Sequence, residues 1–245
     1  MIPAQPSGRA TMSPDLPKAR RYFEWVVSEI EQYLGAHILD VGSGYGIHLE
    51  YILPFYSNVT SIELSMECVN ALRQKFRAYR NYEACQGDFE KASNLSWMIS
   101  RGFDTILCLN VLEHLQDDIG ALKRMHQILL QQRGVALLMV PAHTWLYGSM
   151  DKQAGHLRRY TVSALKQMLQ LTGFEIIRLY HFNFLGVWPW FLNNRILKND
   201  LNGSGVGWQI RVFDKYLVPI IKRLELGLKF PFGQSIIAIA RVRND

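Results

Sequence analysis

The chain has 245 residues, of which 49% are hydrophobic and 20% charged, a composition typical of one globular α/β domain and unlike that of a disordered protein. Its net charge of +6 is uneven, because residues 1–150 contain 13 basic and 15 acidic residues whereas residues 151–245 contain 14 and 6. The three cysteines, Cys68, Cys85 and Cys108, have neither a metal-binding nor a disulfide spacing, which excludes a disulfide scaffold. We therefore expect reduced, buried cysteines in a cytoplasmic protein.

The N-terminal residues divide into a leader and a first helix. Residues 1–17 are rich in Pro, Ser and Gly and have no apolar signal core, so we expect a disordered leader followed by one domain over residues 18–245. Apolar residues then recur at helical spacing from Lys18 to Leu34. Tyr22 and Trp25 on this amphipathic helix belong either to the core or to a lid that faces a substrate.

A glycine-rich turn follows the first expected strand, Ala36–Val41. It contains Gly42, Ser43, Gly44 and Gly46, and glycines permit a tight turn in which a ligand lies against bare backbone. The second strand ends about twenty residues later at Glu63, followed by Leu64, and an acid there can accept ribose hydroxyl protons. Asp40 precedes the first glycine, where an anion would repel a pyrophosphate and attract a cation. The pattern favours a nucleotide-type ligand with a positive charge over a dinucleotide or a purely structural turn.

The next two expected strands also end in polar residues. Strand Tyr82–Gln86 leads to Asp88 and Phe89, which could bind and flank an adenine, although Asp88 would also serve as a helix cap. A helix capped by Ser65 and running to about Tyr79 precedes this strand. Strand Phe103–Leu109 delivers the run Asn110-Val111-Leu112-Glu113-His114.

These motifs resemble motif I and motif IV of class I S-adenosylmethionine (SAM) methyltransferases, in the branch that acts on small molecules and quinones. The resemblance implies a Rossmann-like, doubly wound α/β fold with a seven-stranded sheet whose last strand is antiparallel. It also implies SAM as cofactor, S-adenosyl-L-homocysteine as product and no metal, since Asp117 and Asp118 are better explained as helix caps than as metal ligands. The cofactor-binding residues that it implies are Asp40, Gly42, Ser43, Gly44, Gly46, Glu63, Leu64, Asp88, Phe89, Asn110 and Val111.

A long polar and aromatic loop follows the fifth expected strand, Val135–Val140. Its two runs, from Pro141 to Asp151 and from Gly155 to Thr161, resemble a bacterial group of class I methyltransferases found near glycosyltransferases. Loops above the strand ends of such sheets usually carry function. Thr161 is expected to cap a helix that stops at Gly173.

Three histidines are candidate catalytic bases, because an imidazole titrates near neutrality. His143 follows the fifth strand directly and is the preferred base, whereas His114 could equally fix its loop by a hydrogen bond. His156 lies beside Arg158 and Arg159, which could grip an anionic substrate or form a loop salt bridge to Asp151. Two loop tyrosines either hydrogen-bond the acceptor or pack, namely Tyr147 and Tyr160.

The C-terminal third contains a cap between the sixth expected strand, Phe174–His181, and the last strand, Ser235–Val242. Cap elements are expected at about 18–35, 141–160 and 183–233, and Asn183 and Trp188 are further candidates for substrate binding. The helical stretch 212–228 is amphipathic, which favours packing on the sheet edge or on a dimer partner over membrane docking. An aromatic cap with a basic rim would nevertheless suit a lipid-linked substrate at a bilayer surface.

The sequence therefore predicts methyl transfer to a small molecule, at oxygen, on a saccharide, a lipid-linked intermediate or a natural product. Carbon or nitrogen methylation of a quinone-like molecule is the alternative. A nucleic-acid methyltransferase is disfavoured, because the chain has no Asn/Asp-Pro-Pro-Tyr/Phe motif for flipped bases. A noncatalytic SAM-binding protein stays open, and the sequence sets no oligomeric state.

Overall fold

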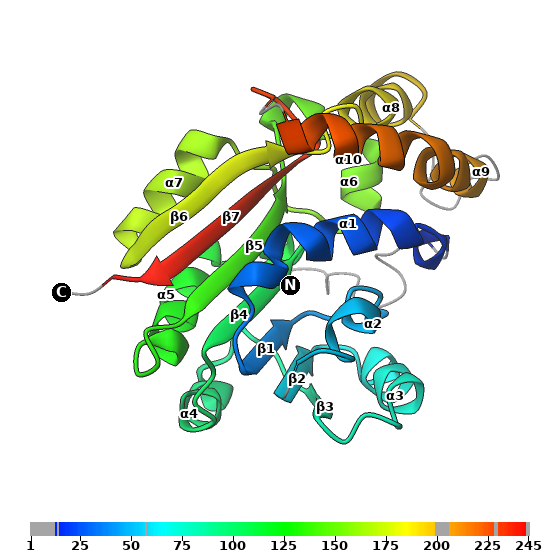
Figure 1. Cartoon of the computed structure of the whole chain (residues 1–245). Coiled ribbons are helices and arrows are strands. Elements are labelled where there is room, and N and C mark those ends of the chain that lie inside the picture. The colour runs from blue at the N-terminus through cyan, green and yellow to red at the C-terminus, as the bar shows by residue number, and fades with distance from the viewer. Residues whose placement is uncertain (1–12, 14, 57, 199–205, 228–229, 244–245) are drawn as a thin grey trace, which may run out of the picture.

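The computed structural model describes residues 13, 15–56, 58–198, 206–227 and 230–243. Seven strands form one sheet in the order β3-β2-β1-β4-β5-β7-β6 (Figure 1). Strands β1 to β5 pair in parallel, and β7 pairs antiparallel with both β5 and β6. The strands are β1 His37–Val41, β2 Asn58–Glu63, β3 Tyr82–Gln86, β4 Thr105–Leu109, β5 Val135–Pro141, β6 Phe174–Phe182 and β7 Ser235–Val242. The expected sheet with an antiparallel last strand is confirmed.

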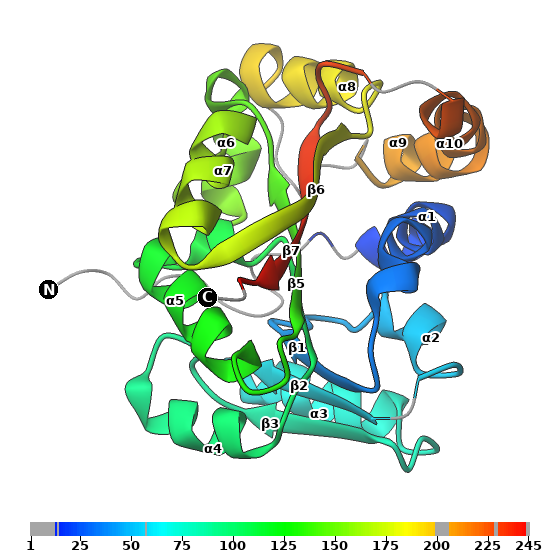
Figure 2. The same cartoon turned by 60° about the vertical axis from the view of Figure 1, so that its left-hand side comes forward.

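Helices cover both faces of the sheet. Figure 2 shows α4, α5 and α7 on one side and α1, α2 and α10 on the other, and a separate hydrophobic core fills each side. The helices are α1 Arg20–Ile30, α2 Leu49–Ile52, α3 Met66–Lys75, α4 Leu95–Ser100, α5 Asp118–Leu129, α6 Ser149–Gln153, α7 Val162–Leu171, α8 Val187–Phe191, α9 Val206–Val212 and α10 Val218–Gly227. Within the described residues, no helix combines the length and apolar character needed to cross a membrane.

The helix caps and the central residues of the strands agree with the expectations from the sequence, whereas the limits of several helices differ from them. Ser65 and Thr161 cap α3 and α7 through their hydroxyl groups, as expected. The helix after the glycine-rich turn, α2, begins only at Leu49, because the backbone of Gly46 has a φ of 61° and continues the turn. The stretch 212–228 is not one regular helix, since a π-helical turn, Phe213–Leu217, separates α9 from α10. A π-turn is a local irregularity that apolar periodicity does not reveal.

The structure describes only part of the leader that was expected before the first helix. Of the leader expected over residues 1–17, residues 1–12 and 14 lie outside the described part of the chain. Leu16–Lys18 forms a short 3-10 helix that leads into α1. The first helix is shorter than expected and ends in another 3-10 turn, Glu31–Tyr33.

The expected cap between β6 and β7 is formed by α8, α9 and α10. These helices gather beyond the carboxyl end of β6 (Figure 1). The backbone N–H groups of Arg21 and Tyr22 donate to the Asp214 carboxylate at 3.3 and 2.8 Å, which fastens α1 to the turn between α9 and α10. These two bonds hold the first helix against the C-terminal part of the cap.

Candidate functional site

The glycine-rich turn connects the carboxyl end of β1 to α2. Gly42, Gly44 and Gly46 all have positive φ angles, of 68°, 54° and 61°. A Cβ atom on Gly42 would lie 2.6 Å from a methyl carbon of Val111, and one on Gly46 would lie 2.6 Å from a methyl carbon of Leu72. The turn thus requires glycine for both its backbone conformation and its packing.

Asp40 is the buried acid at the base of this turn. Its side chain is 1% exposed, and one carboxylate oxygen, Oδ2, lies 3.0 Å from Nε2 of His48. The other oxygen, Oδ1, is buried and has no hydrogen-bond partner among the described residues. A buried carboxylate oxygen without a partner is costly, so the site fits a cationic group placed next to it.

Glu63 closes the same site from the end of β2. Its carboxylate accepts hydrogen bonds from the backbone N–H of Gly44 at 3.1 Å and of Ser65 at 3.0 Å. A carboxylate has about four acceptor positions, so these two bonds fix its orientation and leave capacity for ribose hydroxyl groups. The neighbouring Leu64 is exposed.

The strand ends of β3 and β4 complete the rim of this site. Asp88 accepts a hydrogen bond from the N–H of Glu90 at 3.0 Å, so it orders its own turn. Phe89 is buried in the core on the α5 side of the sheet, and its expected role beside an adenine stays a prediction. Asn110 is exposed with a φ of 56°, and Val111 packs against the first glycine of the turn.

A buried cluster of ionisable groups lies next to the end of β4. Glu113 has no exposed surface, and neither carboxylate oxygen has a hydrogen-bond partner within the described residues. Burial raises the pKa of Glu113 to about 7. Burial, with a smaller contribution from His156, lowers the pKa of His114 to about 4. One carboxylate or imidazole atom from each of Glu113, His114 and His156 lies within 4.8 Å of the others, so the three side chains form one cluster.

Asp151 orients His156 in this cluster. Its Oδ1 lies 2.9 Å from Nδ1 of His156 and accepts a hydrogen bond from Nε of Arg159 at 2.9 Å. With Nδ1 held as the donor, Nε2 of His156 faces Glu113 at 3.9 Å. A histidine oriented by a buried carboxylate is a recurrent arrangement in catalytic sites.

His143 forms a second histidine site, directly after β5. Its ring stacks on that of His181 from β6, with centroids 4.8 Å apart. Burial and the charge of Arg159 lower the pKa of His143, which favours its neutral imidazole. Its Nε2 is buried without a hydrogen-bond partner in the described part of the chain, whereas the ring bonds the backbone of Gly233.

Several residues expected to bind substrate are taken up by internal contacts instead. Trp25 is fully buried and packs on Phe182. Arg159 is buried in its ion pair with Asp151, which is the loop salt bridge that the sequence left as the alternative. The buried Tyr160 donates to Asp118, and the buried Asn183 donates to Gln234. These four side chains are held by internal contacts in this conformation, and their role in substrate binding stays a prediction.

The other expected substrate residues keep part of their surface. Tyr22 is half-buried beneath the cap, and Tyr147 donates its hydroxyl to the carbonyl of His156 at 2.8 Å. Arg158 pairs with Asp118 at 2.7 Å and stays half-buried, while Trp188 is 61% exposed. These four side chains remain candidates for contact with an acceptor.

Sequence reasoning missed the supporting residues of the site. His48 and His181 contact the singled-out residues but belong to no motif. Asp151 was expected only as a salt-bridge partner and not as the residue that orients His156, and Glu113 was noted only as part of a run. Only the contacts that folding produces distinguish them from ordinary polar residues.

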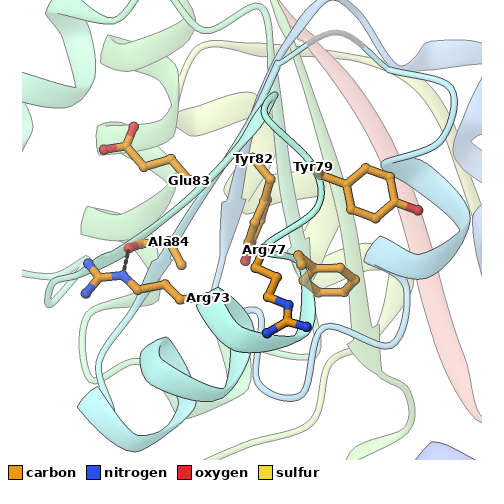
Figure 3. Close-up of a pocket in the computed structure, with 7 residues that line it drawn as sticks. Arg73, Arg77, Tyr79, Tyr82, Glu83 and Ala84 are labelled. Atoms are coloured by element: carbon orange, nitrogen blue, oxygen red, sulfur yellow. Dashed lines mark hydrogen bonds between the residues drawn. The ribbon is translucent and has the colours of Figure 1, made fainter.

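A hollow of about 250 Å³ lies elsewhere, beside the start of β3, and is lined by Arg73, Arg77, Tyr79 and Tyr82 among others (Figure 3). None of the candidate site residues lines it.

Comparisons with known proteins agree with this geometry. Residues 17–179 match the family described as a methyltransferase domain. The chain is 29% identical over 108 residues to a ubiquinone biosynthesis O-methyltransferase of Xanthomonas euvesicatoria, a match that covers 43% of each protein. The chain thus spans less than half the length of the curated relative that it matches.

Solved structures show the same fold. The N-methyltransferase NodS of Bradyrhizobium japonicum, solved with S-adenosyl-L-homocysteine, has a TM-score of 0.56 and 12% identity, covering 95% of this chain and 89% of NodS. The [4+2]-cyclase SpnF has a TM-score of 0.58 and 16% identity, covering 92% of this chain and 81% of SpnF. With the family match over most of the chain, the sheet order and the glycine-rich turn, the protein belongs to the methyltransferase domain family.

Proposed function

We propose that this protein transfers the methyl group of SAM to an oxygen atom of a small-molecule acceptor, such as a saccharide, a lipid-linked intermediate or a natural product. The observation that carries the choice of oxygen is the neutral imidazole of His143, whose buried Nε2 has no hydrogen-bond partner in the described residues. A hydroxyl nucleophile must lose a proton during transfer, and a neutral imidazole can accept it. The partial match to an O-methyltransferase supports the same choice.

The residues of the glycine-rich turn would hold the cofactor by charge and shape. Asp40 would pair with its ammonium group, and Glu63 would accept hydrogen bonds from the ribose hydroxyls. The bare backbone at Gly44 would let the cofactor lie against the turn. Bound SAM supplies an electrophilic methyl carbon, and the protein's own task is to place the acceptor oxygen in line with it and to remove the proton.

His143 is the proposed base, and His181 supports it. The stacked ring of His181 fixes the plane of His143, and the bond to the Gly233 backbone leaves Nε2 as the acceptor nitrogen. The lowered pKa favours an unprotonated Nε2, so the base is ready without prior deprotonation. His114 and the Asp151-oriented His156 are the competing bases, and they lie on the β4 side of the site.

The test is release of S-adenosyl-L-homocysteine with a panel of phenol, quinol and saccharide acceptors, and with amine and carbon acceptors for comparison. We expect His143→Ala to lower kcat by about 10²–10⁴-fold while SAM affinity is retained. His37→Ala is the matched control, because His37 is exposed at the start of β1, at the opposite end of the strand from the glycine turn. Full turnover by His143→Ala, with loss in His114→Ala or His156→Ala, would reassign the base. Turnover only with amine or carbon acceptors would contradict the oxygen assignment.

A further inference from the structure

The cap helices expose a concentration of large apolar side chains. Trp188, Leu192 and Ile196 follow one another at four-residue spacing through α8 and the π-helical turn after it, Leu192–Ile196, and all three are exposed. Such spacing places them along one side of the helix. A second set of exposed apolar side chains lies along α9, the π-helical turn after it and α10, at spacings of four or eight residues. Its members are Trp208, Tyr216, Ile220 and Leu224. We call these seven residues the apolar cap surface.

The two helical segments that carry this surface are joined. The side-chain amide of Asn193 donates to Gln209 at 2.8 Å and to the carbonyl of Pro189 at 2.8 Å. Asn193 and Asn194 are buried, although Leu192 and Ile196 on the same turn are exposed. The polar side of the turn thus faces the protein and the apolar side faces outward, the reverse of an ordinary surface helix.

Basic residues lie on the same helical segments as the apolar cap surface. Residues 187–198 and 206–227 contain six basic residues and two acidic ones, a net charge of +4. Both acids are engaged internally, because Asp214 accepts from the N–H groups of α1 and Glu225 accepts from those of Asn183 and Phe184. The exposed basic residues are Arg195, Lys198, Arg211, Lys215 and Arg223. The outward charge of the surface is therefore positive.

We propose that the apolar cap surface docks the protein on an anionic lipid bilayer. Exposed tryptophan and aliphatic residues with a basic surround are the composition of helices that lie in a membrane interface. A second copy of the chain is a poorer occupant, since a two-fold contact would bring the same basic residues together. An acidic membrane surface complements both the charge and the apolar character.

The docked surface is linked to the candidate site. Asn194, on the inner side of the turn, donates to Asp151 at 2.7 Å, and Asp151 in turn binds His156. Arg195 donates to the carbonyl of Tyr147 at 3.0 Å. One helical turn thus separates the bilayer from the loop that carries the candidate acceptor residues. The docking itself does not depend on the identity of the acceptor or on turnover.

The test is sedimentation of the full chain with vesicles of phosphatidylcholine alone or with 30% phosphatidylglycerol, the mixture being our choice of probe. We expect binding to the anionic vesicles that weakens as salt rises. Ile196→Ser and Ile220→Ser should each weaken it by about tenfold, because each removes a large apolar side chain from the lipid. Lys215→Glu together with Arg223→Glu should weaken it at least as much. Retained SAM affinity in each variant shows that the fold is intact.

The controls are equally exposed residues outside the cap. Leu171→Ser and Phe55→Ser remove exposed apolar side chains, and Lys166→Glu reverses an exposed charge on α7; none should change vesicle binding. As a check that needs no variant, brominated lipid should quench tryptophan fluorescence of the wild-type protein. No binding to anionic vesicles, equal loss in the control variants, or a stable dimer dispersed by Ile196→Ser would overturn the proposal.

Discussion

Replacing Asp40 by Asn tests how the site recognises a positive charge. The substitution keeps the size of the side chain and its capacity to bond His48, which lies 3.0 Å from Oδ2, and removes the negative charge. Hydrogen bonds between charged groups contribute about 1.5–3 kcal/mol, so SAM affinity should fall by roughly 10–150-fold. The stability of the protein without ligand should hold or rise, because the variant no longer buries a carboxylate with an unpartnered oxygen.

Isothermal titration with two ligands locates the charge that Asp40 binds. SAM and S-adenosyl-L-homocysteine both carry the ammonium group, whereas only SAM carries the sulfonium. Pairing with the ammonium predicts an equal loss for both ligands. A loss confined to SAM would place Asp40 next to the sulfonium instead. Unchanged affinity for both ligands, in a variant whose thermal unfolding is cooperative, would refute the assignment of this carboxylate to the cofactor.

Three other substitutions test the surroundings of the site. Gly42→Ala should destabilise the fold by about 1–2 kcal/mol from its positive φ alone, with more from the contact with Val111, and urea unfolding measures the sum. The raised pKa of Glu113 means that the folded state binds more protons than the unfolded state between about pH 4.5 and 7. The free energy of unfolding should therefore fall as pH rises through that window. Glu113→Gln should remove this pH dependence and gain on the order of 1–3 kcal/mol at pH 8; an unaltered stability profile would show that Glu113 is not buried as an acid. Asp151→Asn leaves Arg159 without its buried partner and should cost about 3–5 kcal/mol, and a variant that unfolds at the wild-type urea concentration would contradict this pairing.

The sheet was predictable because its signals are local. Short apolar strands bounded by turn residues placed β3 and β7 at their observed limits, and Ser65 and Thr161 marked helix starts by capping chemistry. The antiparallel placement of β7 came from the family resemblance. A local sequence pattern does not predict which strands are neighbours in the sheet.

The buried polar partners could not be predicted because they depend on packing between distant segments. Asp151 and Asn194 are 43 residues apart in sequence, and their bond exists only because the turn after α8 packs on the loop after β5. The same packing buries Arg159, which by residue type alone is a good anion ligand. Trp25 was ambiguous for a similar reason, since helical periodicity does not tell a core face from a lid.

The central claim is that the turn from Asp40 to Gly46, with Glu63, binds SAM. Isothermal titration of the wild-type chain with SAM, and with NAD as the competing nucleotide, tests it most directly. The account predicts one SAM site per chain with a micromolar dissociation constant, and no heat from NAD. Binding of NAD, or absence of any heat from SAM and S-adenosyl-L-homocysteine at millimolar concentration, would contradict it.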